Sequence, residues 1–204
     1  MKNYINKLNS FDPVTWFRLI NMFLITVCIG ITAPLLISLK GTYMVLWVIT
    51  IFSLGYVFAQ KANKSLVNKS MSDLYRMLTT ANIGIQISLS MYFVDPTYGP
   101  EIAVYGITIV GMFEVMIVTA YGIQLNNWIA TNYPESMKDF GVMKADLSAN
   151  GQLVAMGLAG ALSFIGPDAI VAAALGVYTM VNFWYLKNWN FLEEAEKAQA
   201  EKVA

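Results

Sequence analysis

The chain has 204 residues, 57% of them hydrophobic and only 13% charged, and its formal net charge is zero. Because soluble domains carry about 25% charged residues, this composition excludes an ordinary water-exposed surface, and the neutral balance argues against a nucleic-acid partner. The absence of histidine and the single cysteine, Cys28, exclude histidine-dependent triads, histidine-ligated metals and internal disulfides, so we expect no metal, no cofactor and no enzymatic activity.

Six apolar runs follow one another along the chain, each close to the roughly 20 residues that a helix needs to cross a bilayer. We therefore predict an all-α integral membrane protein with six transmembrane helices arranged as three helical hairpins, within a transmembrane domain of residues 1–190. The last two runs are rich in Ala and Gly, and the sequence leaves open whether they span fully or are re-entrant. The spans are predicted near residues 16–39, 42–60, 76–94, 101–125, 147–165 and 168–187.

Lysine and arginine placement predicts the orientation of these helices. With both termini inside, only Lys40 of the 13 Lys and Arg residues falls on the outer side. Positively charged loops favour the cytoplasm. We therefore expect the bilayer of a bacterial inner or plasma membrane as the main partner, with the N- and C-termini cytoplasmic.

The C-terminal segment, residues 191–204, is built from Glu, Ala, Lys and Gln. Glu193 and Lys197 are four residues apart in the order that favours a helical ion pair. We predict a cytoplasmic helical tail that extends the last span. It is either a solvated helix end or a surface that docks a partner.

Similar landmarks recur in the three predicted hairpins. Asp12, Asp73 and Asp139 lie near the starts of the first, third and fifth spans, and Gly-Pro-acid sequences open the spans at residues 99–101 and 166–168. These landmarks indicate a threefold internal repeat about an axis along the membrane normal. The alternative is that turn chemistry alone recreates them, since Pro and an acid both favour a helix start.

Glu114 is the only charged residue within the run 102–125 and lies near its middle. A carboxyl group at mid-membrane is expensive, so we expect it to face the bundle interior or a wet cavity. It is either a cation-binding or protonation site, or a protonated group that holds neighbouring helices together by hydrogen bonds.

Thr79, Asn82, Gln86 and Ser90 recur at spacings of three or four residues in the span 76–94, which places them on one helix face. Such a stripe does not face lipid comfortably. It either lines a path together with Glu114 as a candidate substrate or ion site, or forms hydrogen bonds between helices.

Small residues mark candidate helix contacts in the last two spans. Ala155, Ala159 and Ser163 recur at every fourth position, as do Ala172 and Gly176. This spacing lets two backbones approach closely. We expect tight packing between the last two helices or an oligomer interface.

Two functions fit this pattern. The first is a small transporter or channel-like protein for a cation or small polar solute, which forms a homo-oligomer and uses Glu114. The second is a non-catalytic membrane scaffold or accessory subunit that binds another membrane protein, for example in host–phage defence or immunity. In the second function the polar residues serve only packing.

Overall fold

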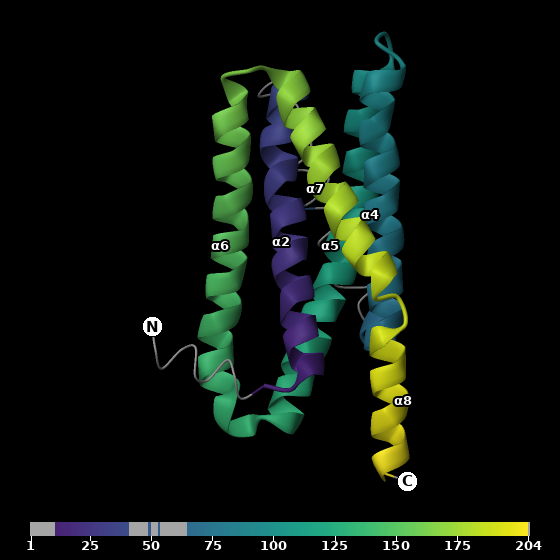
Figure 1. Ribbon diagram of the computed structural model, residues 1–204, viewed down its shortest axis with the longest axis vertical. Helices are drawn as coiled ribbons and strands as arrows, with labels where there is room; N and C mark the ends of the chain where they lie inside the picture. Colours follow the sequence, from purple (N-terminus) through teal and green to yellow (C-terminus); the bar gives the residue numbers. More distant parts are fainter. Residues whose placement is uncertain (1–10, 41–48, 50–52, 54–64, 204) are drawn as a thin grey trace.

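The computed structural model describes residues 11–40, 49, 53 and 65–203. All regular structure in this part of the chain is helical. Apart from two positions, the predicted span near residues 42–60 lies outside the described residues. The helices, labelled as in Figure 1, are α2 (Pro13–Lys40), α4 (Met71–Val94), α5 (Gly99–Asn132), the short 3-10 helix η1 (Pro134–Ser136), α6 (Met137–Ser163), α7 (Pro167–Lys187) and α8 (Phe191–Val203).

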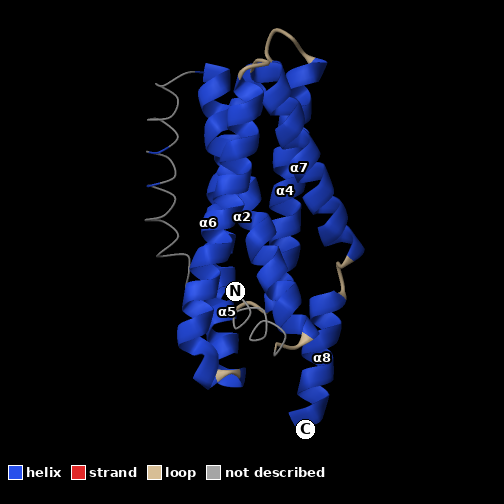
Figure 2. Cartoon of the chain, turned by 60° about the vertical axis from the view of Figure 1, so that its left-hand side comes forward, coloured by secondary structure: helices blue, strands red, loops and turns tan. Residues whose placement is uncertain are grey.

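The long helices stand side by side in an elongated bundle (Figures 1 and 2). Helices α2, α4 and α6 run in one direction, whereas α5 and α7 run in the other. Helices α4 and α5 form an antiparallel pair with the most extensive packing among the described helices. Helix α7 crosses both α2 and α4, so α2, α4, α5 and α7 enclose a common interior.

Local chemistry explains where the helices begin. The Asp12 carboxylate accepts a 2.6 Å hydrogen bond from the Thr15 N–H ahead of α2, and Ser70 caps α4 through the Asp73 N–H. Helices α5 and α7 open on the two Gly-Pro-acid sequences, as predicted. Gly166 has a φ of 131°, a conformation that favours glycine.

Helix α6 packs mainly along α2, to which it is parallel, and much less against α7. A Cβ added to Gly30 of α2 would lie 2.9 Å from Cβ of Ala155, and one added to Gly151 would meet the Thr26 side chain. The backbones can therefore approach closely at these two levels. The last two predicted spans, α6 and α7, also pack on each other, but less extensively than α6 packs on α2.

Helix α8 is separate from α7 and folds against the start of α4. Three residues, 188–190, separate the two helices, so the predicted continuous extension of the last span is interrupted. Leu192 of α8 is fully buried. The Glu196 carboxylate accepts hydrogen bonds from the Met71 and Ser72 backbone N–H groups at 3.0 and 3.3 Å. Arg76 forms an ion pair with Glu193.

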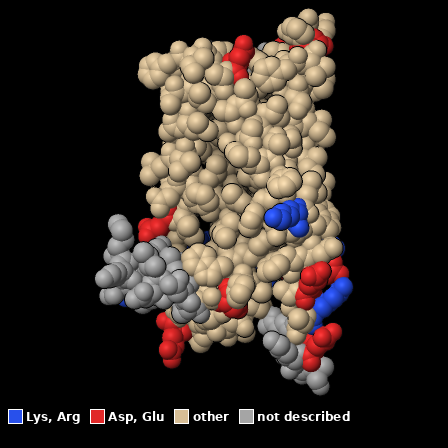
Figure 3. All heavy atoms as spheres, viewed as in Figure 1, with Lys and Arg blue, Asp and Glu red and all other residues tan. Residues whose placement is uncertain are grey.

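The described helices include four candidate membrane spans, Pro13–Ile37, Met71–Val94, Gly99–Asn132 and Pro167–Ala198, each long and apolar enough to cross a bilayer. Helix α6 is not among them. Large apolar side chains such as Ile87, Phe113 and Phe183 are exposed on the bundle surface. In Figure 3 most charged side chains gather toward one end of the molecule, with a few acidic ones at the other. These features are those of a helical membrane protein.

Candidate functional site

The polar side chains of the bundle gather in its interior rather than on its flanks. Most of the buried polar and charged residues belong to α2, α4, α5 and α7, the helices that enclose the common interior. Together with four buried tyrosines they form what we call the polar interior column. Its principal members are Arg18, Asn21 and Thr32 of α2, Tyr75, Asn82 and Gln86 of α4, Glu114 and Tyr121 of α5, and Tyr178, Asn182 and Tyr185 of α7.

Glu114 lies in the middle of this column. Its side chain is only 2% exposed, and its Oε1 has no hydrogen-bond partner among the described residues. The carboxyl is close enough to Cys28 and to the Tyr178 and Tyr185 hydroxyls to interact with them electrostatically. The structure thus places this acid in the bundle interior, away from the lipid-facing surface.

Asn82 lies at nearly the same depth as Glu114. The contacts of Gly84 with Val110 and of Gly106 with Ser88 set the register between α4 and α5. In this register Asn82 and Glu114 are within about one helical turn of each other. Both the Nδ2 and the Oδ1 of Asn82 are buried without a partner among the described residues, a state that costs about 1–3 kcal/mol.

Gln86 joins α4 to α7, beside this centre. The Asn182 Nδ2 donates to the Gln86 Oε1 at 2.6 Å, and the Gln86 Nε2 donates to the Thr179 hydroxyl at 2.8 Å. The Asn182 Oδ1 is buried and has no partner within the described part of the chain. The network therefore leaves one acceptor that faces the interior without a donor.

The column continues toward the end that carries α8. The Trp184 indole donates to the Asn21 Oδ1 at 3.2 Å, and the Asn21 amide approaches the Tyr121 hydroxyl at 3.5 Å. The Tyr75 hydroxyl donates to the Tyr185 carbonyl at 3.0 Å. These contacts tie α2, α5, α4 and α7 together around polar groups.

Toward the opposite end, Tyr178 and Thr32 close the column. Their hydroxyls lie 3.2 Å apart, and both can donate to the Cys28 carbonyl. From Arg18 to Thr32, the column follows α2 for about 21 Å, at 1.5 Å per helical residue. This is a large part of the roughly 30 Å hydrocarbon thickness.

The remaining predicted site residues, Thr79 and Ser90, are satisfied within their own helix. Thr79 donates to the Tyr75 carbonyl and Ser90 to the Gln86 carbonyl, both at 2.9 Å. Thr79 is buried beside the column, whereas Ser90 is half-buried. Both hydroxyls therefore have a hydrogen-bond acceptor, unlike the unpartnered atoms of Asn82 and Glu114.

The small residues expected at interfaces divide into two groups. Ala155 and Ala159 are buried, and Ala155 contacts α2 near Gly30. Ser163, Ala172 and Gly176 are exposed. Ser163 and Ala159 also line an apolar cavity of about 570 Å³ between α2, α6 and α7.

Asp12 and Lys144, two charged groups outside the predicted spans, are among those with shifted pKa values. Partial burial opposes ionisation of Asp12, but hydrogen bonds from the Thr15 N–H and the Tyr133 hydroxyl outweigh it and lower the pKa of Asp12 below 3.8. Burial lowers the pKa of Lys144, whose ammonium donates to the Asn126 Oδ1 at 3.1 Å. Among the described residues, no three His, Cys, Asp or Glu side chains are grouped to hold a metal ion.

Sequence reasoning missed the contribution of α7 and the burial of Arg18. Tyr178, Asn182 and Tyr185 are spaced by four and three residues, the same helical signal that identified the stripe on α4. The charge pattern places Arg18 among the Lys and Arg residues of the inner side, yet its side chain is 1% exposed. No protein-family model, curated protein or solved structure matches this chain.

Proposed function

We propose that the protein carries a small cation, the proton foremost, across the membrane along the polar interior column, with Glu114 as the group that binds or protonates. The observation that carries this proposal is the similar depth of Glu114 and Asn82, two buried side chains. The Glu114 Oε1 and both amide atoms of Asn82 lack partners among the described residues. Water or a cation can supply those partners.

The distribution of satisfied and unsatisfied groups supports transport over simple packing. If the column served only to hold helices together, its polar atoms would be matched, because an unmatched buried group destabilises the fold. The Gln86–Asn182 contact is of the matched kind. Unmatched atoms of the column occur at Asn82, Glu114 and the Asn182 Oδ1, and also at Arg18 and the Tyr185 hydroxyl toward the end that carries α8.

The close packing of the column favours a small species over a larger solute. Tyr178, Tyr185 and Cys28, which interact electrostatically with the Glu114 carboxyl, are each fully buried. A row of hydroxyl, amide and carboxyl groups along the column is suited to the transfer of a proton or a small cation. A homo-oligomer is compatible with this function but is not required by it, because four helices of a single chain enclose the column.

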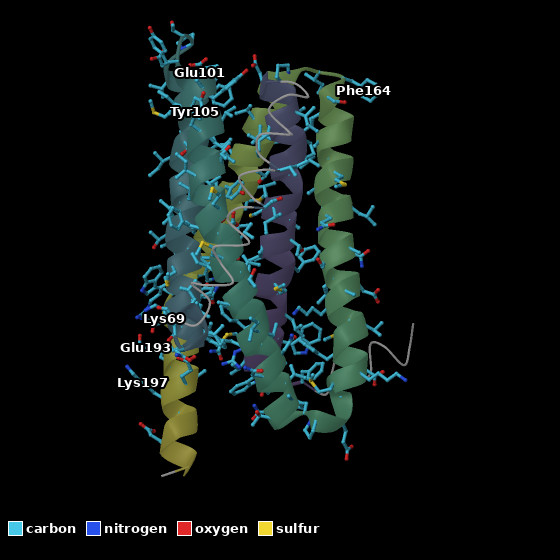
Figure 4. The ribbon with its side chains drawn as sticks, turned by 180° about the vertical axis from the view of Figure 1, so that it is seen from behind. Lys69, Glu101, Tyr105, Phe164, Glu193 and Lys197 are labelled. Carbon is cyan, nitrogen blue, oxygen red and sulfur yellow. The ribbon has the colours of Figure 1, made fainter. Side chains whose placement is uncertain are left out.

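The proposed topology has six spans in three hairpins, with both termini in the cytoplasm. Helices α2 and α4 run in the same direction, so the chain between them returns to the side on which α2 begins. Lys69 and Lys197 lie at the end that carries α8, whereas Glu101 and Phe164 lie at the opposite end (Figure 4). This asymmetry supports a cytoplasmic position for the α8 end in a bacterial-type membrane.

The test is flux through liposomes that contain the purified protein. We expect dissipation of an imposed pH gradient under a valinomycin-clamped potassium potential, and loss of this flux in the Glu114→Gln variant. Exposed Glu135 provides the matched control, since Glu135→Gln removes a carboxylate outside the bundle. Potassium and sodium efflux are measured in the same preparation to identify the transported ion.

Thermal unfolding in detergent separates transport from a scaffolding role. Intact stability of Glu114→Gln with lost flux supports the proposal. If neither the parent protein nor the variant conducts any of the three ions, and Glu114→Gln lowers the melting temperature, the acid serves packing and the scaffold function replaces the one proposed.

A further inference from the structure

Arg18 is a buried cation without a full set of partners. Its side chain is 1% exposed, and its guanidinium carbon lies 3.7 Å from the centroid of the Trp128 ring. Its Nε and Nη1 have no hydrogen-bond acceptor among the described residues. Removing an arginine from water in this way is costly unless an anion or another acceptor replaces the lost solvent.

Two adjoining cavities open beside this guanidinium, between α2, α5 and α8. The first has a volume of about 290 Å³, and its lining includes Arg18, Trp128, Thr131 and Glu196. The second has a volume of about 350 Å³, and its lining includes Arg18, Trp128, Asn132 and Asp12. Arg18 and Trp128 belong to both cavities, so the guanidinium lies between them.

The charged groups that line the two cavities alternate in sign. Asp12 lies in one cavity and Glu196 in the other, with Arg18 between them, and both acids interact with it electrostatically. Neither acid is hydrogen-bonded to the guanidinium. The Glu196 carboxylate accepts from α4, including the Ser72 hydroxyl at 2.7 Å, and Asp12 accepts from Thr15 and Tyr133.

This arrangement does not suit a simple anion. An oxyanion has free donors on Arg18, but it would also meet the Asp12 and Glu196 carboxylates. A ligand that carries a positive group next to its oxyanion satisfies both signs. The oxyanion accepts from the guanidinium, while an ammonium group faces a carboxylate.

We propose that Arg18 and the two cavities form a binding site for a phosphoethanolamine group, with the phosphate at Arg18 and the ammonium toward Glu196 or Asp12. A phospholipid headgroup is the source that fits the position of the site. Arg18 lies near the start of α2, at the end of the bundle where Trp128 and Trp184 mark the expected membrane interface. The site is separate from Glu114, and its test does not depend on ion flux.

The experiment measures thermal stability of the full-length protein against ligand and lipid. In detergent, we expect O-phosphoethanolamine to raise the melting temperature saturably and inorganic phosphate at equal ionic strength to raise it less. In nanodiscs, we expect phosphatidylethanolamine to stabilise the protein more than phosphatidylglycerol does. If only phosphatidylethanolamine stabilises the protein, the site binds the lipid headgroup. If O-phosphoethanolamine also stabilises it, the site binds the free compound as well.

Two variants test the site itself. Arg18→Gln removes the cation and should abolish both responses. Because that change alters a buried residue, Thr131→Glu provides a second test at an exposed position on the cavity wall. The added carboxylate should repel the phosphate and attract the ammonium, so Thr131→Glu should weaken the response to inorganic phosphate and change the response to O-phosphoethanolamine and phosphatidylethanolamine. Thr131→Gln, of similar size and no charge, should respond like the parent protein.

The outcomes are distinct from those of the flux assay. The proposal is overturned if folded Arg18→Gln and Thr131→Glu respond to phosphatidylethanolamine as the parent protein does. It is also overturned if phosphatidylglycerol and inorganic phosphate act as strongly as their ethanolamine counterparts, because the site then recognises an oxyanion alone.

Discussion

The Ser72 hydroxyl of α4 donates a 2.7 Å hydrogen bond to the carboxylate of Glu196 in α8. The same carboxylate accepts from the backbone N–H groups of Met71 and Ser72. Since the first N–H groups of a helix have no partner within it, α8 completes the N-terminus of α4 from a segment more than 120 residues away. The C-terminal helix is therefore part of the folded bundle.

Replacement of Glu196 should accordingly weaken the start of α4. We expect Glu196→Ala to lower the free energy of unfolding by about 1–2 kcal/mol, the usual effect of losing a helix cap with a favourable charge. Amide hydrogen exchange should accelerate in the first turn of α4. Glu194→Ala is the control, because Glu194 is exposed on the same helix; equal effects of the two changes would contradict the capping role.

Replacing Asn82 with an apolar residue should stabilise the protein, whereas replacing a typical buried polar residue destabilises it. Its amide atoms have no partner among the described residues, so Asn82→Leu deletes an unmatched group of similar size. We expect a gain of about 1–3 kcal/mol in the free energy of unfolding, the cost of an unsatisfied buried group. Ion flux in liposomes should fall in the same variant if the proposed function holds.

Asn182→Leu is the matched comparison on α7. It removes the donor of the 2.6 Å hydrogen bond to Gln86 and leaves the Gln86 Oε1 without that partner, so it should destabilise the protein. Chemical unfolding of both variants in the same detergent shows whether each change raises or lowers the free energy of unfolding. Destabilisation by Asn82→Leu of the same size would show that the Asn82 amide is hydrogen-bonded in the folded protein, for example by water in the column.

The starts of α5 and α7 were predictable because their chemistry is local. The Gly-Pro-acid sequences open α5 at Gly99 and α7 at Pro167, as expected. The end of α5 and the start of α6 were less predictable, since α5 continues to Asn132 and α6 begins at Met137, both beyond the apolar runs. Polar helix turns at a membrane surface leave no signal in hydropathy alone.

The candidate site was predictable only in part. The central position of Glu114 and the helix face of Asn82 follow from position and spacing within single spans. The partnership with α7 does not, because a sequence shows which side chains share a face but not which faces meet. The burial of Arg18 likewise depends on Trp128, which is 110 positions away in the chain and reaches it only through the packing of α5 on α2.

The Asp12 carboxylate should make stability depend on pH in the acidic range. Its pKa is lower in the folded state than the ordinary 3.8, so the unfolded chain binds more protons between the two values. Stability from this group is therefore complete above 3.8 and is lost as the pH falls through the folded pKa. Melting temperatures from pH 6 down to about pH 3 test this dependence.

Asp12→Asn should flatten that part of the pH profile, because the amide does not titrate. Tyr133→Phe should reduce the dependence without abolishing it, since the Tyr133 hydroxyl donates one of several hydrogen bonds to Asp12, at 2.8 Å. A profile for Asp12→Asn that is parallel to that of the parent protein at every pH would assign the acid sensitivity to other groups.

Gly30 should be intolerant of even the smallest side chain. Alanine normally stabilises a helix by about 1 kcal/mol relative to glycine. At Gly30, however, the added Cβ would lie 2.9 Å from Cβ of Ala155 and 3.1 Å from Cα of Gln152. Because both neighbours are close to the α6 backbone, α6 must move away from α2, and we expect Gly30→Ala to lower the free energy of unfolding by about 1–3 kcal/mol.

Gly157 of α6 is the matched control, because none of the described residues lies within 4 Å of a Cβ added there. Gly157→Ala should raise the melting temperature or leave it unchanged, while Gly30→Ala lowers it. If the two substitutions have the same effect, α6 is not held against α2 by close backbone contact, and the exposed small residues of α7 would become the better candidates for its packing surface. The opposite signs expected here follow from the α2–α6 geometry alone, since helix propensity favours alanine equally at both positions.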